Sequence, residues 1–490
     1  MVVGEPMVPP ARPPVPSSLV LVIPIHARTL ALWDGVRASY WFLPSLMTVA
    51  AGTLSFVLIG VDARVGPDWI AEVPFLFGNR PDGARSVLST IAGSMIGVAG
   101  VTFSITIASV VYASGQYGPR LLTNFMDDRG NQITLGTFIA TFLYCLLVLR
   151  TIRSAGDGDG LEFVPHIAIL VGLGLAVASV GVLIYFIHHV PESIHVSNLI
   201  AGVGHDLGEK IGVLFPERVG EGATTREAER DDDALTEVPA GFYSDAVRIA
   251  ADGDGYISGL DAEALLTLAT ENDLLVRIRH RPGDFVAAGD TLCLAWPPDR
   301  VSDEAAAGIR TAFAWGRQRS ARQDVRFLVN ELVEIAARAL SPGVNDPFTA
   351  ISCLDWLGAA LKDLSDRDFP SAQRYDSAGQ LRVVAYPTTF EDFVGGVFGQ
   401  LRPYLAADRN AALHALKTLG EVAGRVTDDS RRAALRHQAD AIYEGAQKAL
   451  VLEADRASVR QRHHEVIRLL SGRLDYETAT AQTDWIGGTA

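Results

Sequence analysis

Three histidines and one glutamate follow the last long apolar segment of the chain. The pattern H-H-x-x-E-x-x-H consists of His188, His189, Glu192 and His195. Imidazole nitrogens and carboxylate oxygens are ligands that Zn²⁺ prefers, so a helix carrying this pattern could hold a metal ion. Pro191 disturbs such a helix, and histidines at a membrane exit also serve as amphipathic interfacial groups. The pattern therefore favours the interfacial interpretation, with a metal site as the alternative.

Hydroxyl groups lie along one side of an earlier apolar segment, residues 87–113. At about 100° per residue, one face carries Thr102, Thr106 and Ser109, and Gln116 continues it. Several copies of such a face around an axis could line a path for a small solute or ion. Serine and threonine in membrane helices also bond back to the carbonyl four residues earlier and then need no water. This second role is the plainer one, and pore lining is the functional hypothesis.

Small residues occupy the opposite side of the same segment. They are Gly93, Gly97, Gly100 and Ser104, at helical spacing. Small residues three or four positions apart let two membrane helices approach closely. We therefore expect helix packing through this stripe, and a homo-oligomer is the partner that it favours.

A third polar set lies between two predicted helices near residue 340. Its members are Glu331, Glu334, Arg338, Asn345, Asp346 and Thr349. They could converge into a ligand pocket where the helices meet. Helix termination and capping offer another explanation for these residues. A Ser-Pro-Gly sequence ends the first helix, Asp346 caps the second, and a proline takes the first position of that second helix.

Catalytic motifs are absent from the sequence. It contains no phosphate-binding glycine loop followed by lysine, no GxSxG, no HExxH, and no Cys/His pair at catalytic spacing. Cys145, Cys293 and Cys353 are scattered, which is typical of a reducing compartment and argues against a cysteine zinc site. We predict no catalytic residue and no cofactor, and an enzyme is the least favoured class.

Four apolar segments must position these residues. They cover about 39–61, 87–113, 133–149 and 164–187, and none contains Asp, Glu, Lys or Arg. A helix of about 20 apolar residues crosses the hydrocarbon core of a bilayer. The sequence therefore predicts an α-helical integral membrane protein with four spans in residues 39–200. The lack of charge argues against a voltage sensor or a proton-coupled transporter.

The orientation of these spans rests on indirect signs. Arginines in the short connecting segments divide equally between the two sides. Because no export signal is recognised and the cysteines look reduced, we expect both termini in the cytoplasm and the spans in the inner membrane. The net charge of −15 argues against nucleic acid as a partner.

The rest of the chain divides by composition. Residues 1–38 form a partly disordered tail, 201–239 a linker and 476–490 a disordered tail. Residues 240–300 form a small β-rich module whose turn, residues 281–292, resembles that of barrel-sandwich domains such as lipoyl and biotinyl carriers. The module has no lysine to modify, so we expect a structural role. Residues 301–475 form a helical domain. We therefore expect the C-terminal part of the chain to have an α+β fold and to lie in the cytoplasm.

Several local sequences resemble a bacterial family of predicted membrane proteins, the domain of unknown function 2254. The similar stretches are 41–44, 103–106, 115–122, 127–129 and 339–350, and the likeness runs from about residue 30 to 470. They include the membrane-exit residues Pro119, Arg120 and Asp127. One departure is Gly118, where serine is expected before the Pro-Arg pair. The resemblance implies the membrane architecture and no reaction.

Two functional hypotheses follow from these patterns. The leading one is an oligomeric inner-membrane protein that passes, or controls the passage of, a small solute or ion. The alternative is a membrane-tethered sensor or scaffold whose spans only anchor it, while the cytoplasmic domain binds a ligand or partner.

Overall fold

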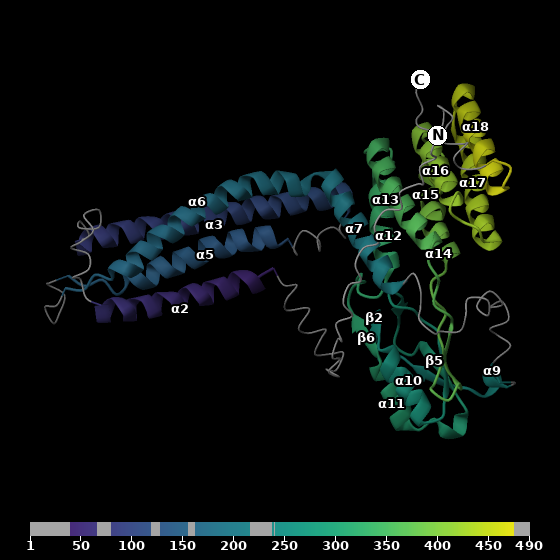
Figure 1. The fold of residues 1–490 in the computed structure, drawn as a ribbon, viewed down its shortest axis with the longest axis horizontal. Helices are drawn as coiled ribbons and strands as arrows, with labels where there is room; N and C mark the ends of the chain where they lie inside the picture. Colours follow the sequence, from purple (N-terminus) through teal and green to yellow (C-terminus); the bar gives the residue numbers. More distant parts are fainter. Residues whose placement is uncertain are drawn as a thin grey trace, which may run out of the picture.

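The computed structural model describes residues 40–65, 80–118, 128–154, 162–215, 238–239 and 241–474. These residues form a bundle of long helices and a C-terminal region, which we define as residues 238–474 (Figure 1). The predicted terminal tails and the exit residues Pro119, Arg120 and Asp127 lie outside the described residues.

Four helices of the bundle are long and apolar enough to cross a membrane, as predicted. They are α2 (Phe42–Val65), α3 (Pro81–Tyr117), α5 (Arg129–Leu149) and α6 (His166–Ile194). Helix α5 is the central one, because 56% of its apolar window is buried, against 17–22% for the other three. Those three helices keep most of their apolar surface open, as surfaces that face lipid do.

The candidate spans are longer than predicted, and their ends carry charge. Helix α2 continues through Asp62 and Arg64, and α3 already includes Asp82 and Arg85. The predicted segments themselves contain no charged residue, and the charges lie where the helices extend beyond them. The Asp62 carboxylate is buried because it accepts hydrogen bonds from two backbone N–H groups at the start of α6, both at 2.9 Å. A carboxylate satisfied at the positive end of a helix dipole is stable there.

The four helices alternate in direction. The ring of Trp41, before α2, lies 6.2 Å from that of Phe103 in the second half of α3. At the opposite end, Asp62 meets the start of α6, and an Arg85 guanidinium donates to the Ile152 carbonyl at 2.9 Å. The start of α2, the end of α3 and the end of α6 thus share one end of the bundle, the end that faces the C-terminal region (Figure 1).

Helix α7 (Val196–Leu214) replaces the first part of the predicted linker. It begins two residues after α6 ends, and it buries Ile200, Val203, Leu207 and Ile211 in the core of the C-terminal region. Their spacing of three and four residues places them on one helix face. The predicted linker over 201–239 is therefore wrong as far as residue 214.

Two small sheets form the β part of the C-terminal region. The larger has the order β1-β5-β3-β8-β7 and the smaller β4-β2-β6. The strands are β1 (Val247–Ala250), β2 (Gly255–Leu260), β3 (Leu275–Ile278), β4 (Phe285–Val286), β5 (Thr291–Trp296), β6 (Phe313–Gly316), β7 (Gln373–Tyr375) and β8 (Leu381–Val384). Strands β3 and β8 pair in parallel, and the other pairs are antiparallel. The β part therefore extends beyond the predicted boundary at residue 300, and a barrel-sandwich topology stays a prediction.

Helices make up the remainder of the C-terminal region. Short helices α9 (Phe242–Asp245), α10 (Ala262–Glu271) and α11 (Asp303–Thr311) accompany the sheets. The helical part comprises α12 (Val325–Ala339), α13 (Pro347–Ser365), α14 (Phe390–Val394), α15 (Gln400–Leu405), α16 (Arg409–Ala423), α17 (Asp429–Ala449) and α18 (Glu453–Leu470). Their apolar faces share one core with α7, so the region and the helix that leaves the bundle form one packed unit.

Candidate functional site

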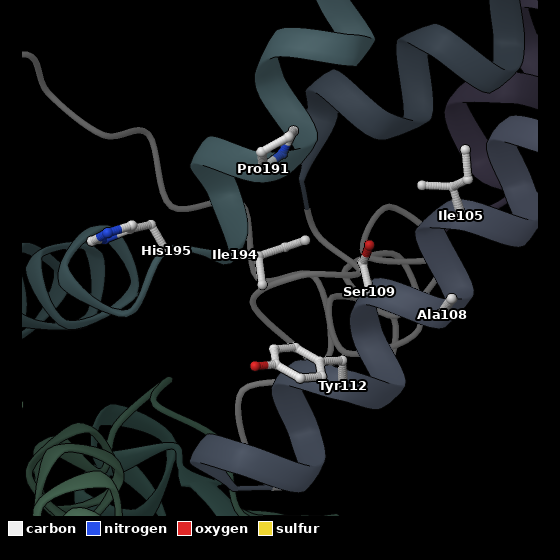
Figure 2. Close-up of a pocket in the computed structure, with 7 residues that line it drawn as sticks. All are labelled: Ile105, Ala108, Ser109, Tyr112, Pro191, Ile194 and His195. Carbon is white, nitrogen blue, oxygen red and sulfur yellow. The ribbon is translucent and has the colours of Figure 1, made fainter. Parts of the chain in front are cut away.

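A cleft of about 510 Å³ lies between α3 and the end of α6, on the side of the bundle that faces the C-terminal region. Its lining consists of Ile105, Ala108, Ser109, Tyr112, Pro191, Ile194 and His195. Figure 2 shows Ile194, at the end of α6, extending toward the part of α3 that carries Ser109. The cleft is wide open rather than enclosed, whereas small-molecule sites bury most of their ligand. With largely apolar walls and two hydroxyls, the cleft suits an apolar or amphipathic molecule.

The cleft brings together two residues that the sequence assigned to different sites. Ser109 belongs to the predicted pore-lining set, and His195 to the predicted metal set. Tyr112 was not predicted to line a site, because its helical spacing places it between the hydroxyl face and the small-residue face of α3. Helix α6 continues through Pro191 to Ile194, and this extension brings the cleft's second wall beside α3.

The other two hydroxyls of the predicted set face the inside of the bundle. Thr102 and Thr106 are each 3% exposed. The Thr102 hydroxyl is within 3.0 Å of the Val98 and Ala99 carbonyls, and that of Thr106 donates to the Thr102 carbonyl at 2.9 Å. Within a single chain, these two hydroxyls therefore bond back to the backbone of their own helix, as the plainer of the two predicted roles requires. Gln116 is exposed at the end of α3, apart from them, and a pore-lining role for the set stays a prediction.

The small-residue stripe of α3 points away from the bundle. A Cβ atom added at Gly93, Gly97 or Gly100 meets no atom of the described residues within 4 Å, and Ser104 is exposed. The stripe does not pack inside one chain, because α3 contacts α5 through its opposite face. Packing between copies stays a prediction, and the exposed stripe is accessible for it.

The predicted metal residues do not converge. The His189 Nε2 atom lies 2.8 Å from an Asp128 carboxylate oxygen, and the Tyr185 ring stacks on the imidazole at 4.9 Å. His188 lies 3.9 Å from Glu192, with both side chains exposed. Adjacent residues of a helix point about 100° apart, so the two imidazoles diverge. Among the described residues there is no group of three or more His, Cys, Asp or Glu side chains placed to hold a metal ion, and the metal hypothesis is not supported.

Asp128 links two helices of the bundle, a role not predicted from the sequence. Its carboxylate caps the start of α5 by accepting from the Gly130 backbone N–H at 2.7 Å, and its second oxygen meets His189. The signal was an aspartate just before an apolar run, which is typical of a helix N-cap. The cap thus ties the start of α5 to the last turns of α6.

The end of α3 contacts helix α12 at a glycine. Gly118 has φ +125°, and a Cβ there would lie 2.9 Å from Glu334 Oε1 and 3.5 Å from Arg338 Nε. Both the backbone conformation and the lack of space favour glycine. Glycine in place of the expected serine therefore has a local reason, and two residues of the predicted C-terminal pocket lie against the end of a candidate span.

The remaining pocket residues form a capped turn. Asp346 caps α13 by accepting from the Thr349 backbone N–H at 3.2 Å and from its hydroxyl at 2.6 Å. Asn345 is exposed, and Glu331 is buried within α12. The capped-turn interpretation is confirmed. These contacts do not bring all six residues together, so a ligand pocket stays a prediction.

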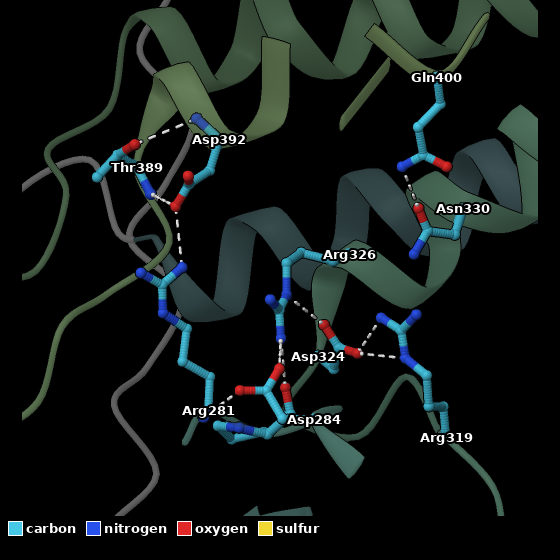
Figure 3. Close-up of polar contacts among 10 residues, drawn as sticks. Arg281, Asp284, Arg319, Asp324, Arg326, Asn330, Thr389, Asp392 and Gln400 are labelled. Atoms are coloured by element: carbon cyan, nitrogen blue, oxygen red, sulfur yellow. Dashed lines mark hydrogen bonds and ion pairs between the residues drawn. The ribbon is translucent and has the colours of Figure 1, made fainter. Parts of the chain in front are cut away.

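Ion pairs fasten the β part of the C-terminal region to its helices. Asp324, before α12, is 3% exposed and lies between two guanidinium groups (Figure 3). Its carboxylate accepts from Arg319 at 2.6 and 3.1 Å and from Arg326 at 3.1 Å. Arg326 also reaches Asp284 of the β part at 3.1 Å. Such shared charge contacts hold the two parts in one orientation.

The cysteines of the C-terminal region are structural. Cys293 and Cys353 are fully buried in apolar surroundings. Burial raises the pKa of the Cys293 thiol to about 12 and raises the pKa of Cys353 as well. A thiol that stays protonated at neutral pH is a poor nucleophile and a poor metal ligand.

Comparison with known proteins gives a consistent result. A family model described as a predicted membrane protein (DUF2254) matches residues 37–421. Uncharacterized proteins of Mycobacterium tuberculosis (Rv1290c) and Mycobacterium bovis (Mb1321c) are each 32% identical to the chain over 438 residues, which cover 88% of this chain and 81% of the relative. No solved structure matches it. The matched residues include all four candidate spans and the junction between the bundle and the C-terminal region.

Proposed function

The chain belongs to the DUF2254 family of predicted membrane proteins, and from that premise we propose that it forms a membrane oligomer whose C-terminal region controls the passage of a small solute or ion. One observation carries this proposal. The C-terminal region is joined to the bundle at two points, the end of α3 and the end of α6. Two rigid attachments let a movement of one part change the spacing of two helices in the other.

The attachment through α6 is packed along its length. Helix α7 continues α6 after a single residue and contacts both α12 and α13. At Gly204 the Trp356 ring lies so close that an added Cβ would be 2.4 Å from it. The Arg367 guanidinium donates to the Phe215 carbonyl at 2.6 Å just beyond the end of α7. Helix α7 therefore moves with the C-terminal region as one body.

The attachment through α3 involves the helix that we expect at the contact between copies. The stripe from Gly93 to Ser104 faces away from its own bundle, so copies of α3 meet if the chain associates through it. A path between copies would then follow α3 to its exposed end at Gln116 and pass the cleft at Ser109. We place the spans in the inner membrane, with both termini in the cytoplasm.

The test is flux through liposomes that contain the purified protein. We expect measurable movement of small ions or solutes, and we expect Gly204→Ala to change its rate because the new methyl group displaces α7 from Trp356. Gly208→Ala is the matched control, since an added Cβ at this position of the same helix meets no atom within 4 Å. Absence of flux under every condition, from protein shown to be folded, refutes the proposal. Equal rates for the two variants refute control through α7.

The alternative is a membrane-tethered sensor, and the cleft favours it. The cleft offers apolar walls and two hydroxyls at the junction, while the hydroxyls of Thr102 and Thr106 are bonded to backbone carbonyls. In a sensor, Ser109→Leu narrows the cleft and removes a melting shift caused by an amphipathic ligand, whereas Thr106→Val leaves that shift unchanged. A ligand-induced shift without any flux would replace the leading proposal with this one.

A further inference from the structure

Two large apolar side chains stand exposed where α12 turns into α13. Phe348 is 72% exposed in the first turn of α13, and Val344 in the preceding turn is 48% exposed. Pro342 beside them is also exposed. We call residues 341–348 the α12–α13 turn. Neighbouring exposed apolar side chains on a folded surface mark a place where something apolar binds.

The register between α7 and α13 places this turn beside the end of a candidate span. The Trp356 ring covers Gly204, and the Arg367 guanidinium donates to the Phe215 carbonyl, so both pairs are 152 residues apart. The two helices therefore run parallel with a constant offset. The same offset sets Phe348 against Val196, two residues beyond Ile194, the last residue of α6.

The end of α12 gives the same position independently. Gly118, which follows α3, lies against Arg338, and the turn begins three residues later, where the Ser341 backbone N–H donates to the Arg338 carbonyl at 3.0 Å. The turn is thus close to the ends of α3 and α6 together. In Figure 1, α13 lies next to this end of the bundle and runs across the direction of the four long helices.

Local geometry holds the apolar side chains outward. Asn345 adopts φ +51°, its backbone N–H donates to the Ser341 carbonyl at 2.9 Å, and Asp346 caps α13. A turn fixed by a cap and a left-handed residue does not fold Phe348 back onto the core. The cap and the left-handed residue thus keep the Phe348 side chain exposed.

We propose that the α12–α13 turn inserts Val344 and Phe348 into the headgroup layer of the bilayer that α3 and α6 leave. The occupant is lipid, because the turn lies beside the ends of α3 and α6, two candidate membrane spans. Aromatic side chains are enriched at this depth, and apolar side chains of interfacial segments enter the boundary between headgroups and acyl chains. The contact is a third attachment point, and it sets the distance between the C-terminal region and the membrane surface. It does not depend on the proposed solute passage.

The experiment uses the full-length protein in phosphatidylcholine liposomes with a nitroxide at Phe348→Cys. The control carries the label at Val451→Cys, which is 87% exposed on the turn between α17 and α18, far from the bundle in Figure 1. Wild type carried through the same labelling reaction measures the background from the three native cysteines, which are buried. Collision with oxygen, which concentrates in the bilayer, is compared with collision with a water-soluble nickel chelate.

We expect the ratio of oxygen to nickel collisions to be several-fold higher at position 348 than at position 451. A label at Val344→Cys should show the same increase, and it keeps the test decisive if Phe348→Cys folds poorly. Equal ratios at 348 and 451 overturn the proposal. Shielding from both reagents, together with spin–spin broadening between labels, also overturns it, because a second copy of the chain would then cover the turn.

Discussion

The buried carboxylate of Asp324 provides the sharpest prediction for the C-terminal region. Replacement by alanine removes the acceptor between Arg319 and Arg326 and leaves two guanidinium groups that are only 20% and 29% exposed. Breaking a buried ion pair by removing one partner costs about 3–5 kcal/mol. Because both arginine side chains retain some contact with water, we expect a loss of about 3 kcal/mol, at the lower end of this range.

A matched control is available in the same cluster. Asp284 also contacts Arg326, at 3.1 Å, but its side chain is 33% exposed. Pairs in contact with water contribute about 0–1 kcal/mol, and the second Asp284 oxygen also accepts a hydrogen bond from the Arg281 backbone N–H at 2.8 Å. Asp284→Ala should therefore cost about 1–2 kcal/mol, less than Asp324→Ala. Asp324→Asn, which keeps the shape and one acceptor, should fall between the two alanine variants.

Thermal unfolding of the full-length protein in detergent micelles, followed by circular dichroism, measures these differences. A change of 1 kcal/mol shifts the melting temperature of a region of this size by about 2–4 °C, so Asp324→Ala should lower it by about 6–12 °C. Equal shifts for Asp324→Ala and Asp284→Ala would show that burial of the central carboxylate does not determine the strength of the cluster.

Three further predictions concern the bundle and one acidic residue. Asp62→Ala removes the acceptor for two backbone N–H groups of α6 and should cost about 1–2 kcal/mol in detergent melting; an unchanged melting temperature would contradict this cap. Gly97→Leu fills the open stripe and should turn an oligomer into monomer by native mass spectrometry without lowering the melting temperature, whereas Gly97→Ala should do so less; a monomeric wild type would refute the stripe as a contact. Hydrogen bonds from the Gln380 backbone N–H and the Arg382 guanidinium lower the pKa of Asp376 in the folded protein, so its stabilising contribution is present above the ordinary carboxyl pKa of about 3.9 and is lost as the pH falls through the lower folded pKa. Asp376→Asn should therefore melt below wild type at pH 7, and a difference that persists undiminished in strong acid would contradict this assignment.

The sequence was informative wherever one helix or strand determined the outcome. Four apolar runs predicted four long helices, and the spacing around Asp346 predicted a cap that the structure contains. The missed helix α7 had its own signal in Ile200, Val203 and Leu207, but the acidic stretch that follows suggested a linker throughout. The apolar face of α7 is shorter than a membrane span. Its role in the core of the C-terminal region is evident only from its packing on α12 and α13.

Relations between distant segments were beyond the reach of sequence patterns. Helical periodicity separated the hydroxyl face of α3 from its glycine face, but it did not say which one meets α5. His189 meets Asp128, 61 residues earlier, a partner that takes this imidazole away from the predicted metal set. The pairing of β3 with β8 likewise joins strands more than 100 residues apart. These contacts form only in the packed fold, and no local pattern in the sequence indicates them.

A density map of the protein in lipid nanodiscs tests the central claim most directly, because it shows the number of copies and the surroundings of α3 at once. We predict more than one copy, with the stripe from Gly93 to Ser104 facing a neighbouring copy and α7 seated on α13 in each. A single copy, or a stripe that faces lipid on every side, would contradict control of a shared path by the C-terminal region.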